Sequence, residues 1–232
     1  LGTYVAALLG HKEIDLAERY TNQLEKLAPN QMATVTLRAR VLYESGEFPK
    51  AMELLKSYCD KPESKGEDRP TRVALIAATL EDLGRRLTKP DQQATSKQFT
   101  EEAEKLYRQY VQQRPEQKLV LAGFLARQKR MDEALTLAEE AWPTSSPELI
   151  ANAMLSLFGG GASGTAQDAR AEKILLAAID KHNRPVSFLT LLADHFSVQR
   201  RYEEAEAVYR EILRGDPKNT LALHNLAVLL AL

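Results

Sequence analysis

A glycine-rich segment, Gly159–Gly164, is the first place in this chain where residue types and spacing could carry chemistry. Such clusters cradle phosphate groups when the last glycine is followed by Lys and then Ser or Thr, at the start of a helix that follows a strand. Here Thr165–Gln167 follow, and the preceding segment has a helical pattern. The cluster therefore predicts a flexible loop rather than a phosphate site.

Histidine and cysteine side chains are the residues most suited to metal binding or nucleophilic catalysis. The four histidines, His11, His182, His195 and His224, do not stand at a metal-ligand spacing with carboxylate or thiol partners. Cys59 has no histidine close in sequence to activate it, so we expect a buried structural thiol. The sequence thus predicts no catalytic residue, no metal site and no cofactor.

Charged pairs recur along the chain. Glu101-Glu102 and Glu203-Glu204 are expected in the first turns of helices, where carboxylates complement the helix dipole. Neighbours on a helix point about 100° apart, so neither pair forms a catalytic couple. Arg85-Arg86, Lys129-Arg130 and Arg200-Arg201 are expected in turns between helices. Acidic residues lie near them and the net charge is −1, which predicts solvated turns and no nucleic-acid surface.

Composition is that of an ordinary folded protein, with 44% hydrophobic and 27% charged residues. No run of apolar residues is long enough for a transmembrane helix, so we expect no direct membrane insertion. A single cysteine excludes an internal disulfide framework but does not decide the compartment. The chain opens on Leu1 and stops at Leu232 inside an apolar helical pattern, so we expect a fragment of a longer protein. A targeting segment would then lie outside it.

All of these residues lie within an internal sequence repeat. Leu189, Leu192, Ala193 and Phe196 recur, after a period of about 34 residues, as Leu223, Leu226, Ala227 and Leu230. Between the two sets lie the residues of a second helix, Tyr202, Ala205, Tyr209 and Ile212, and then Pro217. This order resembles the tetratricopeptide repeat, a helix–turn–helix unit of about 34 residues.

The resemblance implies an all-α, right-handed superhelical solenoid of antiparallel helix pairs, with about 13 helices. The chain is interpreted as one array over 1–232 whose units are about 1–31, 32–69, 70–115, 116–147, 148–185, 186–219 and a partial 220–232. Gly46 is expected to provide the left-handed turn that ends a first helix. Insertions near 88–100 and 159–168 are expected to lengthen the turns between paired helices.

The first helix of each unit, here called helix A, lines the concave binding groove in this family. Carried over by position, the candidate groove residues are Thr36, Arg40, Tyr43, Glu44, Thr71, Ala78, Glu81, Asp82, Ser187, Thr190, Asp194, Ser197, Leu221, His224 and Val228. Some family members hold a chaperone's C-terminal carboxylate with a clamp of Lys, Asn and Arg. Asn225 stands at one clamp position, but Thr190 and Asp194 replace the Lys and Asn that the clamp needs, so that ligand is not predicted.

The resemblance implies a non-catalytic scaffold that binds a peptide, a helix or a protein surface through this groove. Two alternatives stay open. In the first, the chain is the recruitment arm of a larger enzyme, such as a glycosyltransferase or kinase, whose catalytic domain lies outside these residues. In the second, it is a peptide-sensing regulator whose superhelix changes pitch on binding.

Overall fold

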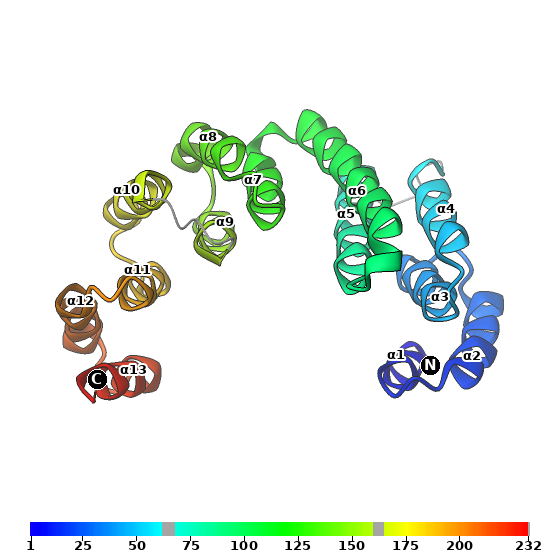
Figure 1. Ribbon diagram of the computed structural model, residues 1–232, viewed down its shortest axis with the longest axis horizontal. Coiled ribbons are helices and arrows are strands. Elements are labelled where there is room, and N and C mark those ends of the chain that lie inside the picture. The colour runs from blue at the N-terminus through cyan, green and yellow to red at the C-terminus, as the bar shows by residue number, and fades with distance from the viewer. Residues whose placement is uncertain (62–67, 160–164, 232) are drawn as a thin grey trace. The chain divides into compact units, whose positions relative to one another are not determined.

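The computed structural model describes residues 1–61, 68–159 and 165–231, and within these ranges it contains thirteen α-helices, three short 3₁₀ helices and no strand. Successive helices pack as antiparallel pairs (Figure 1). The predicted all-α solenoid of helix pairs is therefore confirmed. The chain divides into two compact units, unit 1 over Leu1–Gln113 and unit 2 over Arg114–Leu232. Each is described by itself below.

Unit 1 consists of three helix pairs. Its elements are α1 (Gly2–Gly10), α2 (Ile14–Leu27), α3 (Met32–Glu44), α4 (Phe48–Cys59), α5 (Arg69–Arg86), a 3₁₀ turn η1 (Pro90–Gln92) and α6 (Gln93–Gln113). Between pairs, α2 packs against α3 and α4 packs against α5. Each helix thus buries its apolar side against the helices before and after it.

Unit 2 continues the same arrangement. Its elements are η2 (Pro115–Gln117), α7 (Lys118–Arg127), α8 (Met131–Ala141), η3 (Trp142–Thr144), α9 (Pro147–Gly159), α10 (Thr165–Lys181), α11 (Val186–Val198), α12 (Tyr202–Gly215) and α13 (Thr220–Leu230). Within this unit α7, α9, α11 and α13 are the A helices, and α8, α10 and α12 are their partners, called B helices. No described helix is long and apolar enough to cross a membrane.

Small residues allow the paired helices to approach closely. The second helix of each pair carries at least one alanine that is almost completely shielded from solvent, and these include Ala17, Ala51, Ala103, Ala134, Ala171 and Ala205. Larger residues of the neighbouring helices fill the space around them, as close packing requires. The alternation of small and large residues read from the sequence is therefore the pattern of the core.

Four of the turns between paired helices share one backbone conformation. Gly46, between α3 and α4, has a φ of +79°, which confirms the predicted left-handed turn. Lys12, Lys129 and Arg200 follow α1, α7 and α11 with φ values of 60°, 61° and 61°. Left-handed geometry costs a residue with a Cβ about 1 kcal/mol, so these three turns keep a conformation that glycine would adopt more cheaply.

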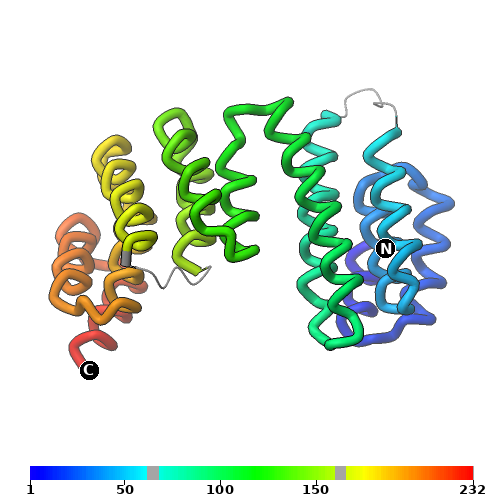
Figure 2. Tube along the Cα trace, turned by 45° about the horizontal axis from the view of Figure 1, so that its top comes forward, coloured from blue at the N-terminus to red at the C-terminus, as the bar shows by residue number. Residues whose placement is uncertain are grey.

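The prediction of a lengthened turn at 88–100 is wrong. The extra residues lengthen the helices instead, so that α5 has 18 residues, α6 has 21, and only a short segment with η1 joins them (Figure 2). Phe99 is fully buried between the two helices, and the Ser96 hydroxyl donates a hydrogen bond to the Gly84 carbonyl at 2.8 Å. Burial of Phe99 stabilises helix in a stretch that is otherwise polar.

Because α6 begins earlier than expected, an acidic pair lies at a different place in the helix than predicted. Glu101-Glu102 lies in the middle of α6 and not in the first turn of a helix, so that prediction is wrong. Lys105 Nζ lies 2.6 Å from the Glu102 carboxylate, and Lys97 Nζ lies 3.7 Å from Glu101. These ion pairs along one helix take the place of the expected dipole interaction.

The glycine cluster lies mostly outside the described residues, because residues 160–164 are not among them. Helix α9 ends at Gly159 and α10 begins at Thr165. Residues 165–168 of the expected insertion near 159–168 are therefore helical.

Candidate functional site

The A helices of unit 2 form the candidate site. Helix α9 packs against both α7 and α11, which makes a continuous row of A helices on one side of the unit (Figure 1). The start of α9 is defined by the Ser146 hydroxyl, which caps the Leu149 amide, and by Pro147 at the first helical position. Asn219 caps α13 by accepting a hydrogen bond from the Ala222 amide at 3.0 Å.

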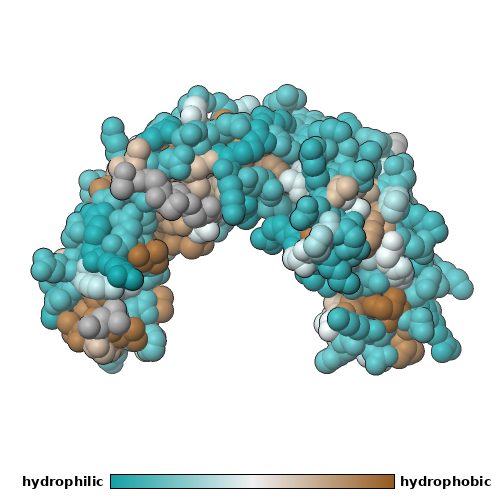
Figure 3. Space-filling model, viewed as in Figure 1, coloured by the Kyte–Doolittle hydropathy of each residue, from teal (hydrophilic) through white to brown (hydrophobic). Residues whose placement is uncertain are grey.

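A first hollow lies between α9 and α11 and has a volume of about 240 Å³. It is mainly apolar, and its lining residues are Leu155, Phe158, Gly159, Leu191, Asp194, His195 and Val198. Leu155 and Val198 keep 56% and 83% of their surface exposed. Figure 3 shows brown, apolar surface over α9 and α11 with teal surroundings. Apolar surface gathered in this way is typical of an interaction site.

A second hollow of about 380 Å³ adjoins the first and lies among α11, α12 and α13. Its lining residues are Asp194, Ser197, Val198, Tyr202, Tyr209, His224, Asn225, Val228 and Leu229. Four of them, Asp194, Ser197, His224 and Val228, belong to the groove set predicted from the sequence. Asp194 and Val198 line both hollows, so the two form one face, which we call the α9–α11–α13 face.

Hydrogen bonds orient the carboxylate at the centre of this face. The Tyr209 hydroxyl donates to Asp194 Oδ1 at 2.6 Å, and Asn225 Nδ2 donates to the same oxygen at 3.3 Å. Burial raises the pKa of Tyr209 to about 12, and the bond to the Asp194 carboxylate acts in the same direction. The phenol therefore stays protonated and keeps donating to Asp194.

The other predicted residues of α11 and α13 are not part of either hollow. Ser187 is exposed, and the Thr190 hydroxyl donates to the Val186 carbonyl of its own helix at 2.9 Å. Leu221 lies in the first turn of α13 and is 54% exposed.

On α3, the predicted groove residues have mixed surroundings. Thr36 donates to backbone carbonyls of its own helix, Arg40 is half-buried and Glu44 is exposed. Tyr43 is only 7% exposed and makes edge contacts with the rings of Phe48 and Phe99 at 5.2 and 6.3 Å. Tyr43 thus packs inside unit 1.

The predicted groove residues on α5 also include both exposed and buried side chains. Thr71 bonds to Asp68 at the start of the helix, and Ala78 is exposed. Asp82 accepts a hydrogen bond from Arg86 Nε at 2.8 Å. Glu81 is 4% exposed and accepts a hydrogen bond from the Tyr107 hydroxyl at 3.0 Å. Glu81 therefore holds α6 against α5 and is not available on the surface.

Sequence reasoning missed Leu155, Phe158 and Val198, although a signal for them exists. The first residues of α9 and α11 are Pro147 and Val186, so Leu155 and Asp194 are both the ninth residues of their helices. Phe158 is the twelfth, like Ser197. The same positions in the fifth repeat, counted from Pro147, place Leu155 and Phe158 on the groove side. Val198 is the thirteenth residue of α11, as Glu44 is of α3.

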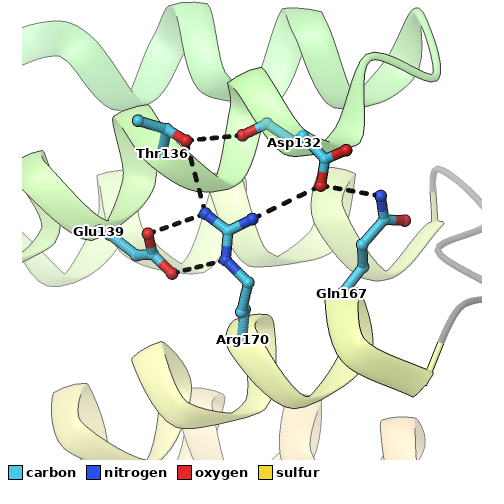
Figure 4. Close-up of polar contacts among 5 residues, drawn as sticks. All are labelled: Asp132, Thr136, Glu139, Gln167 and Arg170. Atoms are coloured by element: carbon cyan, nitrogen blue, oxygen red, sulfur yellow. Dashed lines mark hydrogen bonds and ion pairs between the residues drawn. The ribbon is translucent and has the colours of Figure 1, made fainter.

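Polar contacts tie the B helices of unit 2 together on the opposite side. Arg170 of α10 forms a two-pronged ion pair with Glu139 of α8, from Nε at 2.8 Å and from Nη2 at 2.9 Å (Figure 4). Its Nη1 also reaches Asp132 at 3.5 Å, and Nη2 reaches the Thr136 hydroxyl at 3.4 Å. Gln167 also donates to Asp132 at 3.0 Å. A two-pronged pair fixes the relative orientation of its partners. This network stabilises the spacing of α8 and α10.

His195 and Cys59, whose side chains are of types suited to metal binding or catalysis, are both buried. His195 is 6% exposed, stacks on Phe158 at 4.0 Å, and lies 3.8 Å from a Glu172 oxygen. Burial lowers the pKa of His195, against the opposite effect of nearby carboxylates. Cys59 is 4% exposed and burial raises its pKa to about 11, which disfavours the nucleophilic thiolate. In the described ranges, no three His, Cys, Asp or Glu side chains gather as a metal site.

Solved structures with similar helical arrangements include three that span almost the whole chain. The Cut9–Hcn1 hetero-tetramer of APC/C has 15% identity and a TM-score of 0.45, over 98% of this chain and 42% of that one. The C-terminal part of a TPR repeat-containing protein from Cytophaga hutchinsonii has 17% identity and a TM-score of 0.34, over 97% and 99%. The TPR domain of P58(IPK) has 17% identity and a TM-score of 0.35, over 98% and 63%. The chain thus spans less than half of the Cut9–Hcn1 chain that it resembles. No curated protein sequence matched.

One family model matches two segments of the chain. The model of the tetratricopeptide repeat matches residues 96–149 and again residues 169–220. The first segment begins in α6 and includes the α7–α8 pair, and the second runs from α10 through the α11–α12 pair. Over these two segments, the chain therefore has the sequence pattern of the tetratricopeptide repeat.

Proposed function

We propose that this chain is a non-catalytic scaffold that binds a peptide, helix or protein surface through the α9–α11–α13 face. Tetratricopeptide repeats are protein-interaction modules, and such modules act by surface complementarity. The observation that carries the proposal is the pair of adjoining hollows, with Leu155, Val198 and Val228 each more than half exposed around them.

Energetics favour a partner that covers these side chains. Burying a Val or Leu side chain fully contributes about 1.5–3 kcal/mol, and a side chain that is already partly shielded contributes less. Covering Leu155 and Val198 together should therefore add about 2 kcal/mol or more to binding, which is at least tenfold in affinity.

Selection from a random peptide display library on the purified chain tests this function. The double variant Leu155→Gln/Val198→Gln removes apolar contacts without changing charge, and it is expected to weaken the selected peptides at least tenfold. The matched control is Leu176→Gln, which makes the same substitution at a 41% exposed leucine of the B helix α10. Circular dichroism spectra should be unchanged in all variants. Selected peptides that bind the double variant as well as the unaltered chain would refute binding at this face.

A further inference from the structure

The α9–α11–α13 face carries few charged side chains. Among the described residues that line its two hollows, Asp194 is the only Asp, Glu, Lys or Arg. The rest are apolar, aromatic or uncharged polar side chains. A partner that covers this face therefore meets a single negative charge.

Asp194 is held so that one oxygen faces the solvent without a partner. Its Oδ1 atom accepts both hydrogen bonds, from the Tyr209 hydroxyl at 2.6 Å and from Asn225 at 3.3 Å. Within the described part of the chain, Oδ2 has no hydrogen bond or ion pair, and the residue is exposed. An oriented carboxylate with one free oxygen is a ready acceptor for an ammonium or guanidinium group.

The neighbouring hollow has room for one large apolar side chain. Its volume is about 240 Å³, and a dry cavity of about 150 Å³ is known to hold benzene. Leu155, Phe158 and Leu191 supply apolar walls. Because Asp194 and Val198 border both hollows, a side chain in the first hollow lies next to the free carboxylate oxygen.

In another charged hollow of unit 2, the arginine is already paired. Arg201 lines a hollow with Asp168 and Glu172, but its guanidinium bonds to Glu172 at 2.6 Å and also to Glu204. Such a paired arginine offers little to an acidic partner. The unpaired carboxylate therefore decides the sign of charge that the partner should carry.

We propose that the α9–α11–α13 face selects peptide segments in which a large apolar side chain, such as Leu, Met or Phe, stands beside a Lys or Arg. The apolar side chain occupies the hollow between α9 and α11, and the cation pairs with Asp194 Oδ2. The apolar stem of the Lys or Arg covers Val198 and Val228. This inference rests on the proposed function and adds the chemistry of the partner to it.

A double-mutant cycle tests the charge pair. A peptide selected by display is compared with its Lys→Gln form, on the unaltered chain and on Asp194→Asn, by fluorescence anisotropy at low salt. Asn keeps an acceptor oxygen for Tyr209, so the fold and the orientation of the side chain are retained. Exposed ion pairs contribute about 0.2–1 kcal/mol, so the Lys→Gln change should weaken binding by a factor of about 1.4 to 5 on the unaltered chain and leave binding to Asp194→Asn unchanged.

Glu203→Gln is the matched control, since it removes one exposed carboxylate from the B helix α12. It should leave the effect of the Lys→Gln change intact. Equal weakening on the unaltered chain and on Asp194→Asn would overturn the inference, and so would selected peptides without basic residues. If those peptides still lose affinity for Leu155→Gln/Val198→Gln, the proposed function stands without the basic residue. If they do not, both proposals fail.

Discussion

Replacing Gly84 with alanine should destabilise unit 1, although the same change stabilises most helices. Gly84 lies in α5 where α6 crosses it. A Cβ atom there would stand 3.0 Å from the Phe99 Cβ, 3.3 Å from the Ser96 carbonyl oxygen and 3.3 Å from Thr100 Oγ1. Two of these atoms, the Phe99 Cβ and the Ser96 oxygen, cannot move away by side-chain rotation. Relief therefore requires α6 to shift relative to α5.

The magnitude follows from two opposing effects. Alanine in place of glycine favours a helix by about 1 kcal/mol. Overpacking a closely packed interface costs about 1–3 kcal/mol, and the rigid neighbours here favour the upper half of that range. We expect a net loss of about 1–2 kcal/mol, which corresponds to a decrease of roughly 3–8 °C in melting temperature.

Urea and thermal unfolding followed by circular dichroism would measure this loss. Gly10→Ala is the control, because Gly10 also lies in a helix of unit 1 and a Cβ there meets no atom within 4 Å. It should be neutral or slightly stabilising. Gly84→Val should cost more than Gly84→Ala, since two further methyl groups point into the same contact. An alanine variant as stable as the unaltered chain would refute the close crossing of α5 and α6.

Three further predictions concern particular side chains. Because burial raises the Cys59 pKa from 9.0 to about 11, the native thiol's contribution to stability is present below pH 9 and is lost between about pH 9 and 11. Unfolding free energies should therefore decrease over that window by about 2 kcal/mol relative to Cys59→Ala; parallel pH profiles would refute it. Arg170→Met should cost about 1 kcal/mol in urea unfolding, and the cost should shrink in high salt because it comes from ion pairs with Glu139 and Asp132; a salt-independent loss would point to packing instead. Asp194→Asn should lower the Tyr209 pKa from about 12, because a neutral acceptor no longer opposes the phenolate; an unchanged phenol titration would contradict the bond at 2.6 Å.

Local sequence patterns were sufficient to predict the repeat architecture. Apolar and small residues at helical spacing recur with a period of about 34 residues, and each repeat has a buried side that only neighbouring repeats can cover. Ala193 and Ala205 are fully buried, as the small-residue pattern predicts. The left-handed Gly46 was predictable for a similar reason, since turn geometry depends on a few adjacent residues.

The stretch at 88–100 shows where local reasoning fails. Its polar residues and Pro90 are typical of a turn, and nothing in the local pattern indicates that Phe99 would be buried against α5. The absence of a side chain at Gly84 permits that contact, and Gly84 belongs to the preceding helix, outside this stretch. Helix formation at this point therefore depends on tertiary packing.

Part of the candidate face could be predicted from the sequence, and part could be recognised only in the structure. Position in the repeat was enough to predict Asp194, Ser197, His224 and Val228, because equivalent positions of successive A helices lie on the same side of a stack of repeats. Position alone could not separate these from Tyr43 and Glu81, which stand at similar positions but are buried in unit 1. Whether a side chain lies in an open hollow or inside the core depends on how closely the next helix packs against it. That distance is set by side chains from other repeats, so only the tertiary structure decides it.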